Sequence, residues 1–136
     1  MKTTLQAGIA VQREFPVDAS STIDFMGEDA RVYATPMLVR DIEVTCRELL
    51  LAHLDPGEDS VGTRVEIDHL AATLLGMKVT ISATLAELKG RAAVFEVSAS
   101  DGVDTICRGR HTRFIASVEQ VKQRLKQKQA KAQVPA

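Results

Sequence analysis

One stretch of the chain has the periodicity of a long amphipathic helix, residues 35–53, TPMLVRDIEVTCRELLLAH. Thr35 is the predicted N-cap, and Pro36 follows at the first helical position, where its missing amide hydrogen costs nothing. At about 100° per residue, the apolar side chains fall on one continuous arc and most charged ones fall outside it. The arc consists of Leu38, Val39, Ile42, Cys46, Leu49, Leu50 and His53. A helix with such an arc requires an apolar surface to cover.

Strand-like segments dominate the rest of the chain, at residues 8–17, 60–70, 77–88, 91–100 and 103–116. Pro16 suits an edge strand, because proline cannot donate to a ladder of hydrogen bonds. The later strands alternate with a period of two, which directs every second side chain toward the helix. The expected inward residues are Val61, Thr63, Val65, Ile67 and His69, then Met77, Val79, Ile81, Ala83 and Leu85, then Ala93, Phe95, Val97 and Ala99. The pattern predicts an α+β fold, with one long helix laid on an antiparallel sheet.

The connecting segments have less regular patterns. Residues 18–34 could form a lid over a site, or a plain surface connection that tucks Ile23, Phe25 and Met26 into the edge of the core. The pair Asp101-Gly102 is the strongest hairpin signal in the chain. Residues 117–136 form a polar, basic segment that should begin as a helix at residue 118 and fray toward its end.

Length and composition narrow the class of protein. A chain of 136 residues fits one domain, residues 1–136. A net charge of -1 and an aromatic content of 4% argue against a dedicated nucleic-acid binder. No segment approaches the roughly 20 apolar residues that span a membrane. Cys46 and Cys107 lack metal-ligand spacing, so we read them as reduced packing residues. We therefore expect a cytoplasmic protein without membrane or nucleic-acid partners.

Three residues are candidates for acid–base chemistry, and each has a structural alternative. Strand parity directs His69 toward the helix, where it could be a proton carrier or a satisfied core histidine. Glu43 lies at the margin of the apolar arc, where it could react with a substrate or pair with Arg47, four residues further along the helix. The hydroxyl of Thr35 could serve a site or only cap the helix. Periodicity does not decide between these alternatives.

Two further features could belong to a binding site. Gly62 interrupts a strand, which indicates either a bulge or a close approach of the backbone to a ligand or another chain. Arg108, Arg110, His111 and Arg113 form a small basic patch in the sequence. The patch would be either a solvated strand face or a site for a phosphate or carboxylate group.

Three segments carry a resemblance to a known family: ATPMLVRDIEVTC, LDPGEDSVGTRVEIDHLAATLLG and DGVDTICRGRHTRF. They resemble the fluoroacetyl-CoA thioesterase-like family of the hot-dog-fold thioesterase superfamily, and the likeness extends from about residue 8 to the tail. The resemblance implies a central helix wrapped by an antiparallel sheet, and a homodimer with its sites at the subunit interface. It also implies a catalytic group of Thr35, Glu43 and His69, with the Gly62 backbone at the thioester and Arg113 nearby. No metal or cofactor is implied.

The chain departs from the family at one position. The fluoroacetate-specific member carries a phenylalanine gate ahead of the catalytic threonine, and Asp29 stands there in this chain. The resemblance therefore implies hydrolysis of a small acyl-CoA thioester without selectivity for the fluoroacetyl group. Glu43 would act as base or nucleophile and His69 as general acid–base, with Thr35 orienting one of the reactants. The alternatives are a hot-dog acyl-CoA hydratase or dehydratase, and a non-catalytic module that binds acyl-CoA or another small ligand.

Overall fold

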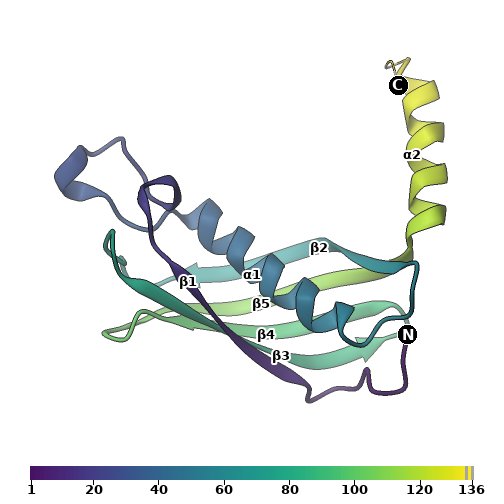
Figure 1. The fold of residues 1–136 in the computed structure, drawn as a ribbon, viewed down its shortest axis with the longest axis horizontal. Helices are drawn as coiled ribbons and strands as arrows, with labels where there is room; N and C mark the ends of the chain where they lie inside the picture. Colours follow the sequence, from purple (N-terminus) through teal and green to yellow (C-terminus); the bar gives the residue numbers. More distant parts are fainter. Residues whose placement is uncertain (134, 136) are drawn as a thin grey trace.

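A computed structural model describes residues 1–133 and 135, and Figure 1 shows one long helix lying across a curved sheet. The strands are antiparallel neighbours in the order β1-β3-β4-β5-β2, so β1 and β2 form the two edges. This arrangement confirms the predicted fold and the predicted edge position of the first strand. The elements are β1 Ala10–Pro16, α1 Thr35–Leu51, β2 Glu58–His69, β3 Lys78–Lys89, β4 Ala92–Ser100, β5 Thr105–Ser117 and α2 Val118–Ala132, with short 3-10 turns at Ala19–Ser21 and Glu28–Ala30.

The core lies between α1 and the sheet, as the alternation predicted. The predicted inward residues of β3 and β4, from Val79 to Leu85 and from Ala93 to Ala99, are all buried. From α1 the buried apolar residues are Leu38, Ile42, Cys46, Leu49 and Leu50. Both cysteines are buried and unpaired, which agrees with the prediction that they serve packing. Burial of this kind is the main force that holds the helix on the sheet.

The ends of α1 differ from the prediction. Ala34 is the N-cap residue and Thr35 is already inside the first turn, so the predicted capping role of Thr35 is wrong. The helix ends at Leu51, and His53 lies in the following turn, where its Nδ1 is 2.7 Å from Thr4 Oγ1.

Asp41 was expected away from the core, yet it is only 5% exposed. The hydroxyl of Tyr33 donates a hydrogen bond to the Asp41 carboxylate, which compensates for the burial of this polar group.

A β-bulge in β2 overturns part of the predicted strand face. The pairing of β2 with β5 shifts its register between Gly62 and Arg64. Residues directly opposite in an antiparallel pair share a face, and one extra residue reverses the parity of the strand. Val65 lies opposite the buried His111 and therefore faces α1, as predicted, whereas Val61 lies opposite the partly exposed Phe114 and is itself 49% exposed. On the His69 side of the bulge the predicted facing holds, although Val65 is still 36% exposed, and the prediction is wrong for Val61.

The connection between β1 and α1 is a folded surface loop. The loop is held by isolated bridges that join Thr22 to Tyr33 and Val32 to Leu74. Phe25 is 78% exposed and Met26 is also exposed, so the alternative in which these residues tuck into the edge of the core does not hold for either of them.

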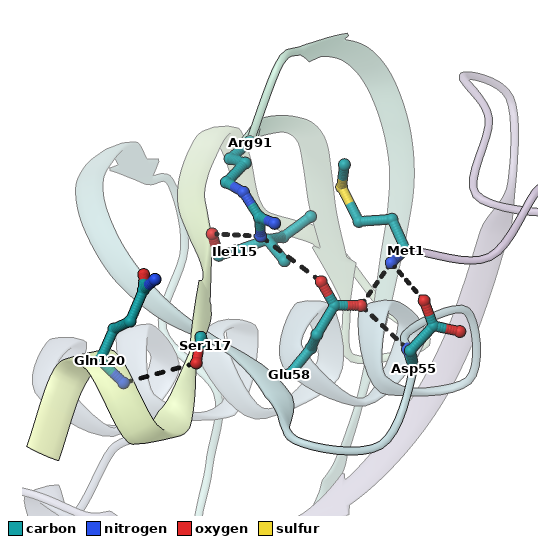
Figure 2. Close-up of polar contacts among 7 residues, drawn as sticks. All are labelled: Met1, Asp55, Glu58, Arg91, Ile115, Ser117 and Gln120. Carbon is teal, nitrogen blue, oxygen red and sulfur yellow. Dashed lines mark hydrogen bonds and ion pairs between the residues drawn. The ribbon is translucent and has the colours of Figure 1, made fainter.

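The N-terminus is tied to the turn that precedes β2, as Figure 2 shows. The Met1 ammonium group forms ion pairs with Asp55 and Glu58, and Arg91 Nη1 lies 3.4 Å from the Glu58 carboxylate. The hydrogen bond from Met1 holds the pKa of Glu58 below its usual value. These contacts fasten the connection from α1 to β2 at the end of the sheet opposite His69.

The second helix starts where the sequence predicted. The hydroxyl of Ser117 accepts a hydrogen bond from the Gln120 amide and caps α2, which projects from the sheet in Figure 1. The helix continues to Ala132, and of the end where the segment 117–136 was predicted to fray, residues 134 and 136 lie outside the described part. Among the described helices, none is long and apolar enough to span a membrane.

Candidate functional site

Thr35 and His69 form the first half of the candidate site. Thr35 is the first residue of α1 and His69 is the last residue of β2, and the fold brings these two element ends together. The Oγ1 atom of Thr35 lies 2.7 Å from Nδ1 of His69, within hydrogen-bond distance. His69 Nε2 is buried and has no hydrogen-bond partner among the described residues. Thr35 itself is exposed, so this hydroxyl–imidazole pair is accessible to a substrate.

The surroundings of His69 favour a neutral imidazole. Burial lowers the pKa of His69, because a charged ring would lose its hydration. The Tyr33 ring packs edge-on against the imidazole, with 6.4 Å between the ring centroids. A neutral histidine with a hydroxyl at one nitrogen can accept and return a proton near pH 7.

An open pocket of about 400 Å³ adjoins this pair. Its walls come from the β1–α1 loop, the first turn of α1 and the segment after β2. The lining is mostly apolar and consists of Ile23, Phe25, Val32, Tyr33, Ala34, Thr35, His69, Leu70, Ala71 and Ala72. Such a pocket suits a short apolar group held beside the Thr35 hydroxyl.

Glu43 lies in a second cluster, against the bulge of β2. A Cβ atom at Gly62 would come within 2.2 Å of Glu43 Oε1, so any larger residue there would displace this carboxylate from its present position. Glu43 Oε1 lies 3.7 Å from Arg113 Nη1 and 3.9 Å from His111 Nε2. The Glu43 side chain remains 41% exposed, so its carboxylate is accessible to solvent and ligands. Of the two alternatives considered for Gly62, the structure shows the bulge, which begins at this residue, and it places the Glu43 carboxylate against the glycine.

Arg113 is the buried cation of this cluster, and it is only 4% exposed. Its Nε donates a hydrogen bond to Ser60 Oγ at 2.7 Å, and its Nη2 donates one to the Ser60 carbonyl at 2.8 Å. Burial lowers the pKa of Arg113, whereas the neighbouring Glu43 carboxylate raises it. A buried guanidinium requires a nearby anion, and Glu43 supplies that charge.

The structure decides two further alternatives that the sequence left open. Arg47 pairs with Asp59, through contacts of 3.0 and 2.7 Å, and the alternative helix-surface pair between Arg47 and Glu43 does not occur among the described residues. The predicted basic patch is divided between two faces of β5. Arg108 and Arg110 are on the outer face, whereas His111 and Arg113 face α1 and are buried. The parity of the strand, counted from Cys107, would have revealed this division.

The two clusters are separate within one protomer. Thr35 and Glu43 are eight residues apart on α1, which corresponds to about 12 Å along the helix axis. This separation exceeds the reach of a hydrogen bond. The sequence reasoning did not single out Ser60 as a site residue, and it placed His111 only in the basic patch. Within the part that the structure describes, no group of three His, Cys, Asp or Glu side chains is arranged to hold a metal ion.

Comparisons with known proteins identify the family and the fold of this chain. The model of the fluoroacetyl-CoA-specific thioesterase family matches residues 17–119. A fluoroacetyl-CoA thioesterase from Streptantibioticus cattleyicolor is 33% identical over 135 residues, covering 94% of this chain and 97% of the relative. The crystal structure of a fluoroacetyl-CoA-specific thioesterase variant has a TM-score of 0.86 at 33% identity, with 93% of this chain and 99% of the other covered.

Two solved structures extend the comparison beyond these enzymes. A thioesterase superfamily member from Thermus thermophilus has a TM-score of 0.88 at 26% identity, over 98% of this chain and 99% of the other. A hot-dog-like protein from Thermanaerovibrio acidaminovorans has a TM-score of 0.83 at 24% identity, over 90% and 91% of the two chains, and supports the fold alone. The predicted hot-dog fold is confirmed.

Proposed function

The chain belongs to the fluoroacetyl-CoA-specific thioesterase family, and we propose that it hydrolyses a small acyl-CoA thioester to the free acid and CoA. Thr35, Glu43 and His69 are the proposed catalytic residues. The observation that carries this proposal is the 2.7 Å contact between the Thr35 hydroxyl and His69, at the edge of an apolar pocket. The contact holds a neutral imidazole beside the pocket, where the ring can take and return a proton during hydrolysis of a bound thioester.

The proposed reaction adds water to the thioester carbonyl and breaks the bond between carbon and sulfur. As general base, Glu43 takes one proton from the attacking water, and that proton ends on the departing thiolate, directly or through His69. Thr35 orients the thioester at the mouth of the pocket. The carbonyl oxygen gains negative charge in the transition state, and backbone N–H groups at the Gly62 bulge are the proposed donors to it, because a bulge interrupts the pairing of the strand.

We propose a homodimer that completes the site. β2 is an edge of the sheet and can pair with the same strand of a second copy. In an antiparallel pair of β2 strands, with the two-fold axis about midway between Gly62 and His69, His69 lies opposite Gly62 of the partner subunit. The Thr35–His69 pair then meets Glu43 of the partner subunit, which closes the separation of about 12 Å between the clusters.

The proposed substrates carry a short acyl group. Asp29 stands where the fluoroacetate-specific enzyme of the resemblance has its phenylalanine gate, and here it lies exposed in the short turn Glu28–Ala30. A carboxylate at this place would not exclude water as an aromatic ring does. We therefore propose no special preference for fluoroacetyl-CoA. We also propose a reducing, cytoplasmic location, which both unpaired cysteines fit.

The test is release of free thiol from a panel of short acyl-CoA thioesters, including acetyl-CoA and fluoroacetyl-CoA. Wild-type protein should release CoA, whereas Glu43→Gln and His69→Ala should each lower kcat by about a hundredfold or more. A hydratase would change the acyl chain without releasing thiol, and a binding module would show affinity without turnover. Near-wild-type turnover in both folded variants would reject the proposed site. A fluoroacetyl preference above about a thousandfold in kcat/KM would reject the proposed selectivity.

A further inference from the structure

His111 is a buried histidine to which the proposed reaction assigns no part. It lies on β5 with no measurable exposure, on the face toward α1 and opposite Val65 of the bulged strand. Both of its ring nitrogens have partners. Nδ1 is 2.8 Å from the backbone carbonyl of Arg64, and Nε2 is 3.1 Å from Arg113 Nη1. His111 thus connects the bulge of β2 to the guanidinium that faces Glu43.

The hydrogen-bond partners determine the tautomer of His111. A carbonyl oxygen can only accept a hydrogen bond, so Nδ1 must carry the hydrogen that points to Arg64. A guanidinium can only donate, so Nε2 must present its lone pair to Arg113. The two contacts together require a neutral ring with its hydrogen on Nδ1. Burial, reinforced by the charge of Arg113, lowers the pKa of His111 and is consistent with this state.

The guanidinium of Arg113 is held at all three of its nitrogens. Nε and Nη2 both bind Ser60, which fixes the plane of the group. Nη1 is the nitrogen that faces Glu43, and His111 is the acceptor that holds it in place. Without that acceptor, Nη1 would be a buried donor that has lost its hydrogen-bond partner, with the Glu43 carboxylate 3.7 Å away, and the guanidinium would move toward this carboxylate.

We propose that His111 is a positioning residue. It holds Arg113 at a distance from Glu43 at which the Glu43 carboxylate stays beside Gly62 and remains free to react. This inference rests on the proposed role of Glu43 in hydrolysis. The contact of 3.7 Å supplies the compensating charge while leaving the Glu43 oxygens free to bind water. A direct bidentate pair between Arg113 and Glu43 would instead occupy the oxygens that must take up a proton.

Two substitutions at this position separate the two contacts of His111. In His111→Gln, the amide oxygen can reach the position of Nε2 and accept from Arg113, while the contact with Arg64 is lost. In His111→Asn, the shorter amide can reach the position of Nδ1 and donate to Arg64, while the contact with Arg113 is lost. The pair is matched, because each variant keeps one neutral amide and one of the two hydrogen bonds.

The readout is steady-state thiol release by both variants, with folding checked by circular dichroism and thermal unfolding. His111→Gln should keep kcat within about threefold of wild type, whereas His111→Asn should lose roughly tenfold or more, with KM changed less than about twofold in both. If His111 served only to hold the bulge through Arg64, His111→Asn would keep more activity than His111→Gln. That result, or equal activity in both variants, would overturn the inference.

Two companion variants keep the test decisive. Ser60→Ala removes the Nε partner of Arg113 at a different position, and it should lower kcat at unchanged KM even if His111→Asn does not fold. Unchanged kcat in Ser60→Ala would then count against the inference. Glu43→Gln, measured in parallel, separates the two levels of proposal. If Glu43→Gln stays active, the proposed function of Glu43 fails and this inference fails with it. If Glu43→Gln is inactive while the His111 variants do not differ, only this inference fails.

Discussion

Mixing two inactive variants tests whether each site is shared between protomers. The structure places Thr35 and His69 in hydrogen-bond contact within one protomer and separates them from Glu43 by about 12 Å along α1. If Glu43 comes from the partner subunit, a mixed dimer of Glu43→Gln and His69→Ala contains one intact site and one that lacks both groups. If the site lies within a protomer, neither site of the mixed dimer is intact.

The expected magnitude follows from counting sites. After random exchange of equal amounts, about half of the dimers are mixed and each has one working site of two, so activity should recover to about a quarter of wild type. Each unmixed variant should remain near about one hundredth. The assay is thiol release after co-refolding, or on mixed dimers purified through two different tags. Recovery to only about one hundredth would refute the shared site.

A matched mixture provides the control. Thr35 and His69 belong to the same half-site, so His69→Ala mixed with Thr35→Val should not recover, because both variants damage the same side. Glu43→Gln mixed with Thr35→Val should recover as the first mixture does. Recovery in the His69–Thr35 mixture would contradict the pairing of these two side chains.

Two predictions concern stability. Ile42 lies on the face of α1 toward the sheet and is fully buried, so Ile42→Ala should lower the free energy of unfolding by about 2–5 kcal/mol in urea denaturation, and a loss below about 1 kcal/mol would contradict the packing. His69 and His111 have folded-state pKa values below the usual 6.5, so the unfolded chain binds protons that the folded chain does not. Unfolding free energy should therefore fall as pH drops below about 6.5, by at most about 1.4 kcal/mol per pH unit for each histidine. His111→Gln should flatten this dependence, and an unchanged slope would contradict a neutral buried His111.

The sequence alone determined the elements whose pattern is local. The alternation through Val79 and Ile81 in β3, and through Phe95 and Val97 in β4, predicted the faces that are buried. The apolar arc of α1 predicted that Ile42 faces the sheet. These patterns suffice because burial of one face constrains every second residue of a strand and every third or fourth residue of a helix. The resemblance to a family added the candidate residues Thr35, Glu43 and His69, whose catalytic roles stay predictions.

Only the tertiary structure decided which partner each polar side chain has. Arg47 had Glu43 four residues away and pairs instead with Asp59 on β2, which reaches Arg47 only once helix and sheet are packed together. The bulge in β2 reversed the facing of Val61 and brought Gly62 against Glu43, and a single inserted residue leaves no periodic signature by which to locate it. Arg113, which from the sequence could equally be a solvated surface charge, is buried. Its burial is possible because Ser60 and Glu43, both more than 50 residues earlier in the chain, compensate its donors and its charge. Local periodicity determines which way a side chain faces, whereas pairing between segments distant in the sequence determines which groups it contacts.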